Sequence, residues 1–279
     1  SNIWVALGGA LLAAETFALS NQCFNGLVIL QMFAASFVVY NLQRLVKSKQ
    51  YAVHSQAATF TEKNKSALLL AIAVCCLFLL FSPWPVTADL LILGFSLLVA
   101  SALYVLRIFP AKGKLKSLRE FPVVKIFVVT AVWAVATTVL PPLLSNSSMP
   151  NGCVAMVLER WFYFMAITIP FDIRDMLVDD PSNKTIPQLV GAKMARNIAC
   201  TFILAMVGAN VFRLNAGWLS ITSFVSLFFV AVLSLWLIKK SKPGTDNMLF
   251  AGWLDGTMFL RGVLVLLAVV SEVQGFFEC

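Results

Sequence analysis

Nine long runs of apolar residues, separated by short polar segments, restrict the fold of this sequence more than any other feature. A transmembrane α-helix needs about 20 mostly apolar residues, because the hydrocarbon core of a bilayer is about 30 Å thick. Only 12% of the residues are charged, about half the share of an ordinary soluble domain. We therefore expect an all-α integral membrane protein with nine transmembrane helices, forming a single transmembrane domain over residues 1–279. The expected spans are approximately 3–20, 23–42, 66–84, 87–106, 122–141, 152–171, 195–212, 216–238 and 250–271.

The basic residues indicate how the chain is oriented. Most of the 21 Lys and Arg residues lie in alternate loops, after the second, fourth, sixth and eighth expected spans. By the positive-inside rule, these loops and the N-terminus are expected in the cytoplasm. The basic residues are dispersed over loops rather than gathered with aromatics on one patch, so no nucleic-acid partner is expected.

An acidic cluster follows the sixth span, in the stretch "IPFDIRDMLVDD". Asp172, Asp175 and Asp179 are at helical spacing, so they share one face. Carboxylates this close repel each other unless a cation lies between them, and Mg²⁺ typically uses one or two carboxylates together with waters and substrate phosphates. We interpret the cluster as a site that holds Mg²⁺ against a diphosphate. The alternative is a solvated turn whose acids pair with Arg174 and Lys184.

A basic loop after the fourth span offers the complementary charge, in "LYVLRIFPAKGKLK". Arg107, Lys112 and Lys114 could clamp phosphate oxygens, and Tyr104, one turn before Arg107, could donate a hydrogen bond to them. The alternative is that these residues fix the topology and bind anionic lipid head groups.

Several further charged residues lie within or near the expected spans, namely Glu15, Glu159, Arg160, Asp255 and Arg261. Ionisable residues inside a membrane often mark a transport pathway. They could instead be residues at span ends or local pairs, Glu159 with Arg160 and Asp255 with Arg261.

With these motifs in place, the chain resembles the UbiA superfamily of intramembrane prenyltransferases over most of its length. The resemblance rests on the nine spans, on "DIRDMLVD" after the sixth and on "YVLRIFPAKGK" after the fourth. The stretches "YNLQRLVK", "IPFDIRDM" and "KTIPQLVGAKMARNIA" look especially like UbiA-like proteins of Bacteroidetes. The resemblance implies a nine-helix UbiA-like bundle in a bacterial inner membrane.

The resemblance also implies an activity and its site. In that family two Asp-rich motifs hold Mg²⁺, which binds the diphosphate of an allylic isoprenoid, and a lipid-soluble acceptor attacks the prenyl carbocation. The implied metal ligands and catalytic residues here are Asp172, Asp175 and Asp179. The implied diphosphate-binding residues are Asn41, Arg44, Tyr104, Arg107, Lys112 and Lys114.

The first Asp-rich motif of the family is degenerate in this chain. Asn41 is kept, but Leu42, Leu45 and Lys49 stand where the family has aspartates. One hypothesis is therefore a divergent, Mg²⁺-assisted prenyltransferase acting on an isoprenoid diphosphate, with Arg44 substituting charge for one metal ion. The other is an inactive protein of the same fold that binds a lipid, quinone or pigment, or serves as a subunit beside a protein partner.

Overall fold

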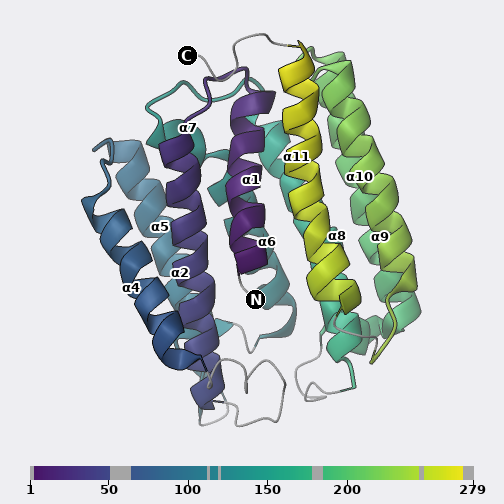
Figure 1. Cartoon of the computed structure of the whole chain (residues 1–279). Helices are drawn as coiled ribbons and strands as arrows, with labels where there is room; N and C mark the ends of the chain where they lie inside the picture. Colours follow the sequence, from purple (N-terminus) through teal and green to yellow (C-terminus); the bar gives the residue numbers. More distant parts are fainter. Residues whose placement is uncertain are drawn as a thin grey trace.

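The structure, a computed structural model, describes residues 3–50, 64–111, 114–118, 121–177, 185–244 and 248–272. It is a bundle of long α-helices with a short β-hairpin (Figure 1). The α-helices are α1 (Ile3–Leu19), α2 (Gly26–Gln50), α4 (Lys65–Phe81), α5 (Ala88–Val105), α6 (Pro122–Thr138), α7 (Leu140–Leu144), α8 (Cys153–Asp175), α9 (Ile186–Asn215), α10 (Ile221–Lys240) and α11 (Asp255–Glu272). The π-helix η3 (Met248–Leu254) leads into α11, and strands β1 (Phe109–Ala111) and β2 (Lys114–Lys116) pair antiparallel.

All nine apolar runs form helices, which confirms the expected fold class. Five described helices are long and apolar enough to cross a membrane: Gly26–Gln43, Cys153–Asp175, Ile186–Asn215, Ile221–Lys240 and Gly252–Glu272. The other four are shorter apolar helices, Ile3–Leu19, Lys65–Phe81, Ala88–Tyr104 and Val123–Thr138. The structure therefore supports an integral membrane bundle, and the count of nine crossings stays a prediction.

The first helix lies inside the bundle, between the second helix and the last. Helix α1 packs along α2 on one side and along α11 on the other (Figure 1). The approach to α11 depends on Gly262, where an added Cβ would lie 2.9 Å from the Leu11 carbonyl oxygen. Close helix approach through glycine is common in membrane bundles. Helices α8, α9 and α10 complete the core with buried aliphatic and aromatic side chains.

Helix α7 and the start of helix α9 differ from the expected spans. The separate short helix α7 begins at Leu140 and has Pro141 and Pro142 in its first turn, because proline fits the first turn of a helix but not its interior. Helix α9 begins at Ile186, nine residues before the expected span, with a capping box between Thr185 and Gln188. Its first turns contain Pro187 and Gly191, residue types common in loops, and Gly191, with φ of 80°, bends the helix there.

One end of the bundle carries the described residues that were assigned to the candidate site. Helices α2, α8 and α10 all finish at the lower end in Figure 1. We call this end the basic-loop end, because Arg107, Lys239 and Lys240 lie on the segments that finish there. Helices α1 and α9 finish at the opposite end.

Candidate functional site

Asp172 lies in the last turn of α8 at the basic-loop end and is almost fully buried. Its Oδ1 atom is 2.8 Å from Nζ of Lys125, which lies in the first turn of α6. A carboxylate in apolar surroundings needs a partner charge, and this pair joins α6 to α8. Lys125 is not among the residues that the sequence assigned to the site. Its distance along the sequence from Asp172 gave no signal of the contact.

Asp175 lies one turn further along α8 and is paired with its neighbour. Nε of Arg174 is 2.6 Å from Oδ1 of Asp175, and Nη2 is 2.9 Å from Oδ2. The Arg174 guanidinium also lies over the rings of Phe171 and Phe250, about 5 Å from each centroid. The expected alternative, in which acids of this cluster pair with Arg174, is therefore correct for Asp175. Asp179 and Lys184 lie outside the described residues.

Asn41 is buried on α2, and its Nδ2 atom donates to the Phe37 carbonyl oxygen at 2.7 Å. Leu45, which stands where the family has an aspartate, packs beside the buried residues Ala6, Phe37 and Ile72. Leu42 is exposed. The degenerate motif therefore contributes apolar packing on this helix. The side chains of Arg44 and Lys49 lie outside the described residues.

The basic loop after α5 is only partly described. Arg107 is exposed just beyond the end of α5, and Tyr104 is half-buried in its last turn. Lys114 begins β2, where it pairs in register with Ala111, and Lys112 lies outside the described residues. Tyr104 is close enough to Tyr40 of α2 to interact with it electrostatically.

A row of aromatic rings runs inward from this end, and the sequence did not identify its members. Tyr40, Trp133, Phe164 and Tyr163 follow one another with ring centroids 5.5 to 5.6 Å apart. Trp133 Nε1 donates to the Tyr40 hydroxyl at 2.8 Å, and the Tyr163 hydroxyl shares a hydrogen bond with Thr257. The row links α2, α6 and α8.

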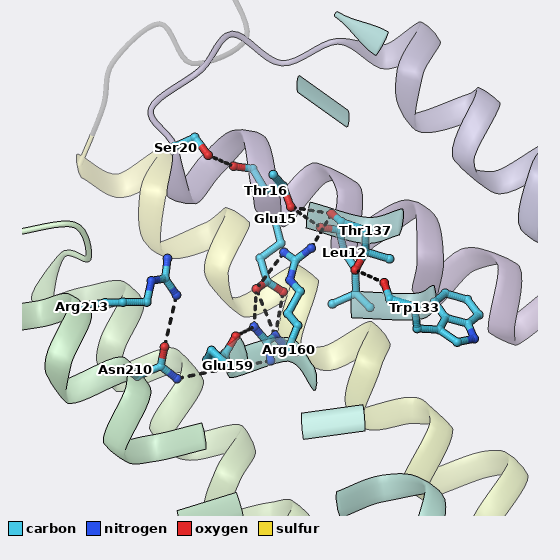
Figure 2. Close-up of polar contacts among 11 residues, drawn as sticks. Leu12, Glu15, Thr16, Ser20, Trp133, Thr137, Glu159, Arg160, Asn210 and Arg213 are labelled. Carbon is cyan, nitrogen blue, oxygen red and sulfur yellow. Dashed lines mark hydrogen bonds and ion pairs between the residues drawn. The ribbon is translucent and has the colours of Figure 1, made fainter. Parts of the chain in front are cut away.

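A fully buried ionic network lies beyond this row, toward the opposite end (Figure 2). Arg261 of α11 donates to both carboxylates, at 2.7 to 3.0 Å from Glu15 of α1 and 2.7 to 2.9 Å from Glu159 of α8. Nη2 of Arg160 lies 3.3 Å from Glu15. Asn210 bridges Glu159 to Arg213 on α9.

This network corrects the expected local pairs. Glu159 bonds to Arg261 rather than to its neighbour Arg160, and Arg261 faces Glu15 and Glu159 rather than Asp255. Partners on different helices cannot be read from spacing within one span. Since every Glu and Arg of the network has zero exposed area, we interpret it as an interhelical lock rather than as a transport path.

The fold defines a class, a bundle of long apolar α-helices. No protein-family model matches the sequence, and no curated protein matches it. Two solved structures resemble it. The apo structure of a UbiA homologue from Aeropyrum pernix K1 has a TM-score of 0.68 and 13% identity, covering 97% of this chain and 98% of that one. A structure of digeranylgeranylglyceryl phosphate synthase has a TM-score of 0.59 and 14% identity, covering 97% and 95%. The chain therefore has the fold of the UbiA superfamily.

Proposed function

We propose that this protein transfers an isoprenoid group from an allylic diphosphate to a lipid-soluble acceptor within the membrane. The observation that carries the proposal is the charged end of α8, where Asp172 and Asp175 remain in the last turn of a UbiA-type bundle. One of the solved neighbours is named for the synthesis of a prenylated lipid. An acid held nearly buried at the end of an apolar helix is a functional candidate by default.

The α8 acids fit one magnesium ion. Among the described residues no group of three or more Asp, Glu, Cys or His side chains comes together. Asp172 and Asp175 nevertheless lie one turn apart, and Mg²⁺ needs only one or two protein carboxylates beside waters and phosphate oxygens. We propose Asp172, Asp175 and Asp179 as its ligands. When bound, the ion would neutralise charge on the departing diphosphate.

The chain's own groups would do the remaining work. Arg44, Arg107, Lys112 and Lys114 would bind diphosphate oxygens by charge, and Asn41 and Tyr104 by hydrogen bonds. Lys125 would hold Asp172 in place and add a cation beside it. The ring faces of the aromatic row would stabilise a prenyl cation, and an apolar lining would keep water from it.

A second candidate function is a non-catalytic protein of the same fold that binds a lipid, quinone or pigment or sits beside a protein partner. The observation that favours it is the packing of Leu45 where the family has an aspartate. In that case no isoprenoid diphosphate is turned over, and a ligand or partner co-purifies.

Binding of farnesyl thiolodiphosphate, a non-reactive analogue, separates the two candidates. The purified chain is titrated with the analogue in Mg²⁺ and then in EDTA. Binding that is lost in EDTA supports the proposal, and binding that persists shows that the basic residues replace the metal. If neither this analogue nor its geranylgeranyl counterpart binds, the transferase proposal fails.

We also propose that the basic-loop end faces the cytoplasm of a bacterial inner membrane, which the distribution of Lys and Arg supports. Pro243 and Asn215 are exposed at opposite ends of the bundle. In a chain without its natural cysteines, Asn215→Cys should react with a membrane-impermeant maleimide in spheroplasts, and Pro243→Cys should not. The reverse pattern would invert the orientation.

A further inference from the structure

Arg213 lies in the last turn of α9, at the end of the bundle opposite the α8 acids, and has no exposed area. Its Nη1 atom donates to Oδ1 of Asn210 at 3.2 Å, and Figure 2 shows it at the edge of the network. Its Nε and Nη2 atoms are buried and have no hydrogen-bond partner among the described residues. Two donor atoms of a buried guanidinium are therefore unused within that part of the chain.

The charges of the buried network do not balance. It contains three guanidinium groups and two carboxylates, all without exposed area, so one positive charge is left over among the described residues. Glu159 and Glu15 attract Arg213 electrostatically, but each carboxylate bonds to Arg261 at 2.7 Å. Arg160 also lies within ion-pair distance of Glu15. The arginine of the network that makes no ion pair within the described ranges is Arg213.

A structural role alone accounts poorly for this unpaired cation. The negative end of the α9 dipole favours a cation in the last turn. That contribution is small beside the cost of burying an unpaired charge. Arginine keeps its charge in proteins, so it cannot lower this cost by losing a proton. A water molecule could accept from Nε or Nη2 but would leave the charge uncompensated. The partner that fits Arg213 is therefore an anion.

An apolar groove of about 550 Å³ lies at the same end, between the start of α8 and the end of α9. This volume is within the usual range of ligand sites, about 300–1,000 Å³. Ala209 lines the groove, and Arg213 is four residues further along the same face of α9, with its side chain leaning over the preceding turn. Trp218 also lines it and donates its backbone N–H to the Arg213 carbonyl oxygen at 2.9 Å. The groove thus adjoins the turn that carries Arg213.

The position of Arg213 along α9 matches the level of lipid head groups. It lies two residues before the exposed turn 215–217 that ends the helix. Trp218 follows that turn, and tryptophan is enriched where a membrane bundle meets the head groups. A charged group beside Arg213 and an acyl chain in the groove are the two parts of one anionic lipid.

We propose that Arg213 binds the phosphate of an anionic phospholipid whose acyl chain lies in this groove. The phosphate oxygens accept from Nε and Nη2, and the phosphate charge balances the network. Because protein atoms cover the guanidinium here, binding requires side chains of the groove wall to turn aside. The inference goes beyond the proposed transfer reaction, since it concerns the opposite end of the bundle from Asp172 and Asp175.

The test uses Cys153, a free cysteine that lines the groove. In the full chain with its other cysteines replaced by serine, the rate of Cys153 modification by N-ethylmaleimide is measured in dodecyl maltoside. Dioleoyl phosphatidylglycerol, dioleoyl phosphatidylcholine and inorganic phosphate are titrated separately. We expect phosphatidylglycerol to protect at a concentration at least about tenfold lower than phosphatidylcholine, the size of one charge-assisted hydrogen bond. Inorganic phosphate should not protect, because it has no acyl chain to fill the groove.

Arg213→Gln should abolish the preference for phosphatidylglycerol. Its unfolding temperature in lipid-free detergent should not fall, because the variant removes an unpaired charge, whereas a structural role predicts a fall. Arg213→Lys keeps the charge and should retain the preference. Arg196→Gln is the matched control, because Arg196 lies on the same helix near its other end and donates to the Ser241 carbonyl oxygen. It should leave the preference unchanged.

Three results would overturn the inference in the labelling experiment. They are equal protection by the two lipids, protection by inorganic phosphate at the same concentrations, and a preference that survives in Arg213→Gln. A fall in the unfolding temperature of Arg213→Gln as large as that expected for Arg261→Met would also overturn it, because Arg213 would then be a structural member of the network.

Discussion

The buried network and the basic-loop end contain the same kinds of charged side chain but differ in how completely these are enclosed. In the network the paired side chains of Glu15, Glu159 and Arg261 have no exposed area. At the basic-loop end Lys125 is 26% exposed and Asp175 is 40% exposed. The paired groups of the first region present no charge to a ligand, and the second region presents partly exposed charged groups.

The difference shows that an ion pair inside a membrane bundle is not by itself a sign of chemistry. A fully enclosed pair is costly to break, because removing one partner leaves an unpaired buried charge. A partly exposed pair is weaker, since water screens it, and so its partners can be exchanged for a metal or a phosphate. Stability should therefore respond to changes in the network, and ligand binding to changes at the basic-loop end.

The largest expected effect is on stability, from Arg261→Met. Glu15 and Glu159 both lose their main partner, and we expect a loss of about 3–5 kcal/mol in the free energy of unfolding. Thermal unfolding in detergent measures it. Combining Arg261→Met with Glu159→Gln should restore part of the loss, because position 159 then carries no unpaired charge and Glu15 keeps Arg160 as a partner. A single variant as stable as the parent would show that the network is not a lock.

Asp175→Asn should have the opposite effect to Arg261→Met, because it should lower the activity and leave the stability nearly unchanged. It should reduce Mg²⁺-dependent turnover of an isoprenoid diphosphate by at least about a hundredfold, about 2.7 kcal/mol in the barrier. The unfolding temperature should change little, because the Asp175 carboxylate is substantially exposed. Release of pyrophosphate and thermal unfolding are measured on the same preparation. Full activity in the variant would remove Asp175 from the site.

Gly262→Ala tests how the network depends on helix spacing. The new methyl group would lie 2.7 Å from Cβ of Leu11, so α1 and α11 must move apart, at a cost of about 1–3 kcal/mol. Gly94→Ala is the control, because nothing lies within 4 Å of a Cβ added there. Equal stability of the two variants would show that close approach of α1 and α11 is not required.

The smallest expected effect comes from Arg174→Lys. Lysine keeps the charge but loses the two-atom contact with Asp175 and the planar contact with Phe171 and Phe250. We expect the free energy of unfolding to fall by about 0.5–1 kcal/mol, measured by thermal unfolding. We also expect a modestly weaker affinity for the diphosphate analogue, measured by titration. A change as large as that of Arg261→Met would contradict the contrast between the two regions.

The sequence predicted the elements of this bundle better than the contacts between them. Apolar runs of helical length located every long helix, because hydropathy within a segment is a local property. The Asp172–Lys125 pair joins residues 47 positions apart, and the network joins α1 to α11, so neither could be inferred from spacing. Asp255 was recognised as charged within an apolar segment, but its spacing from Arg261 did not show that Arg261 bonds to Glu15 and Glu159 instead.

The contact between Glu15 and Arg261 spans 246 residues of sequence, and this sets an order of events during biosynthesis. At about 5–20 residues per second, a ribosome needs about 12 to 50 seconds to extend the chain from one to the other. Throughout that interval the α1 carboxylate has been made and its principal counter-ion has not. The bundle of the growing chain can close only after helix α11 has been made. A chain truncated before α11 therefore contains Glu15 but lacks Arg261, its main partner.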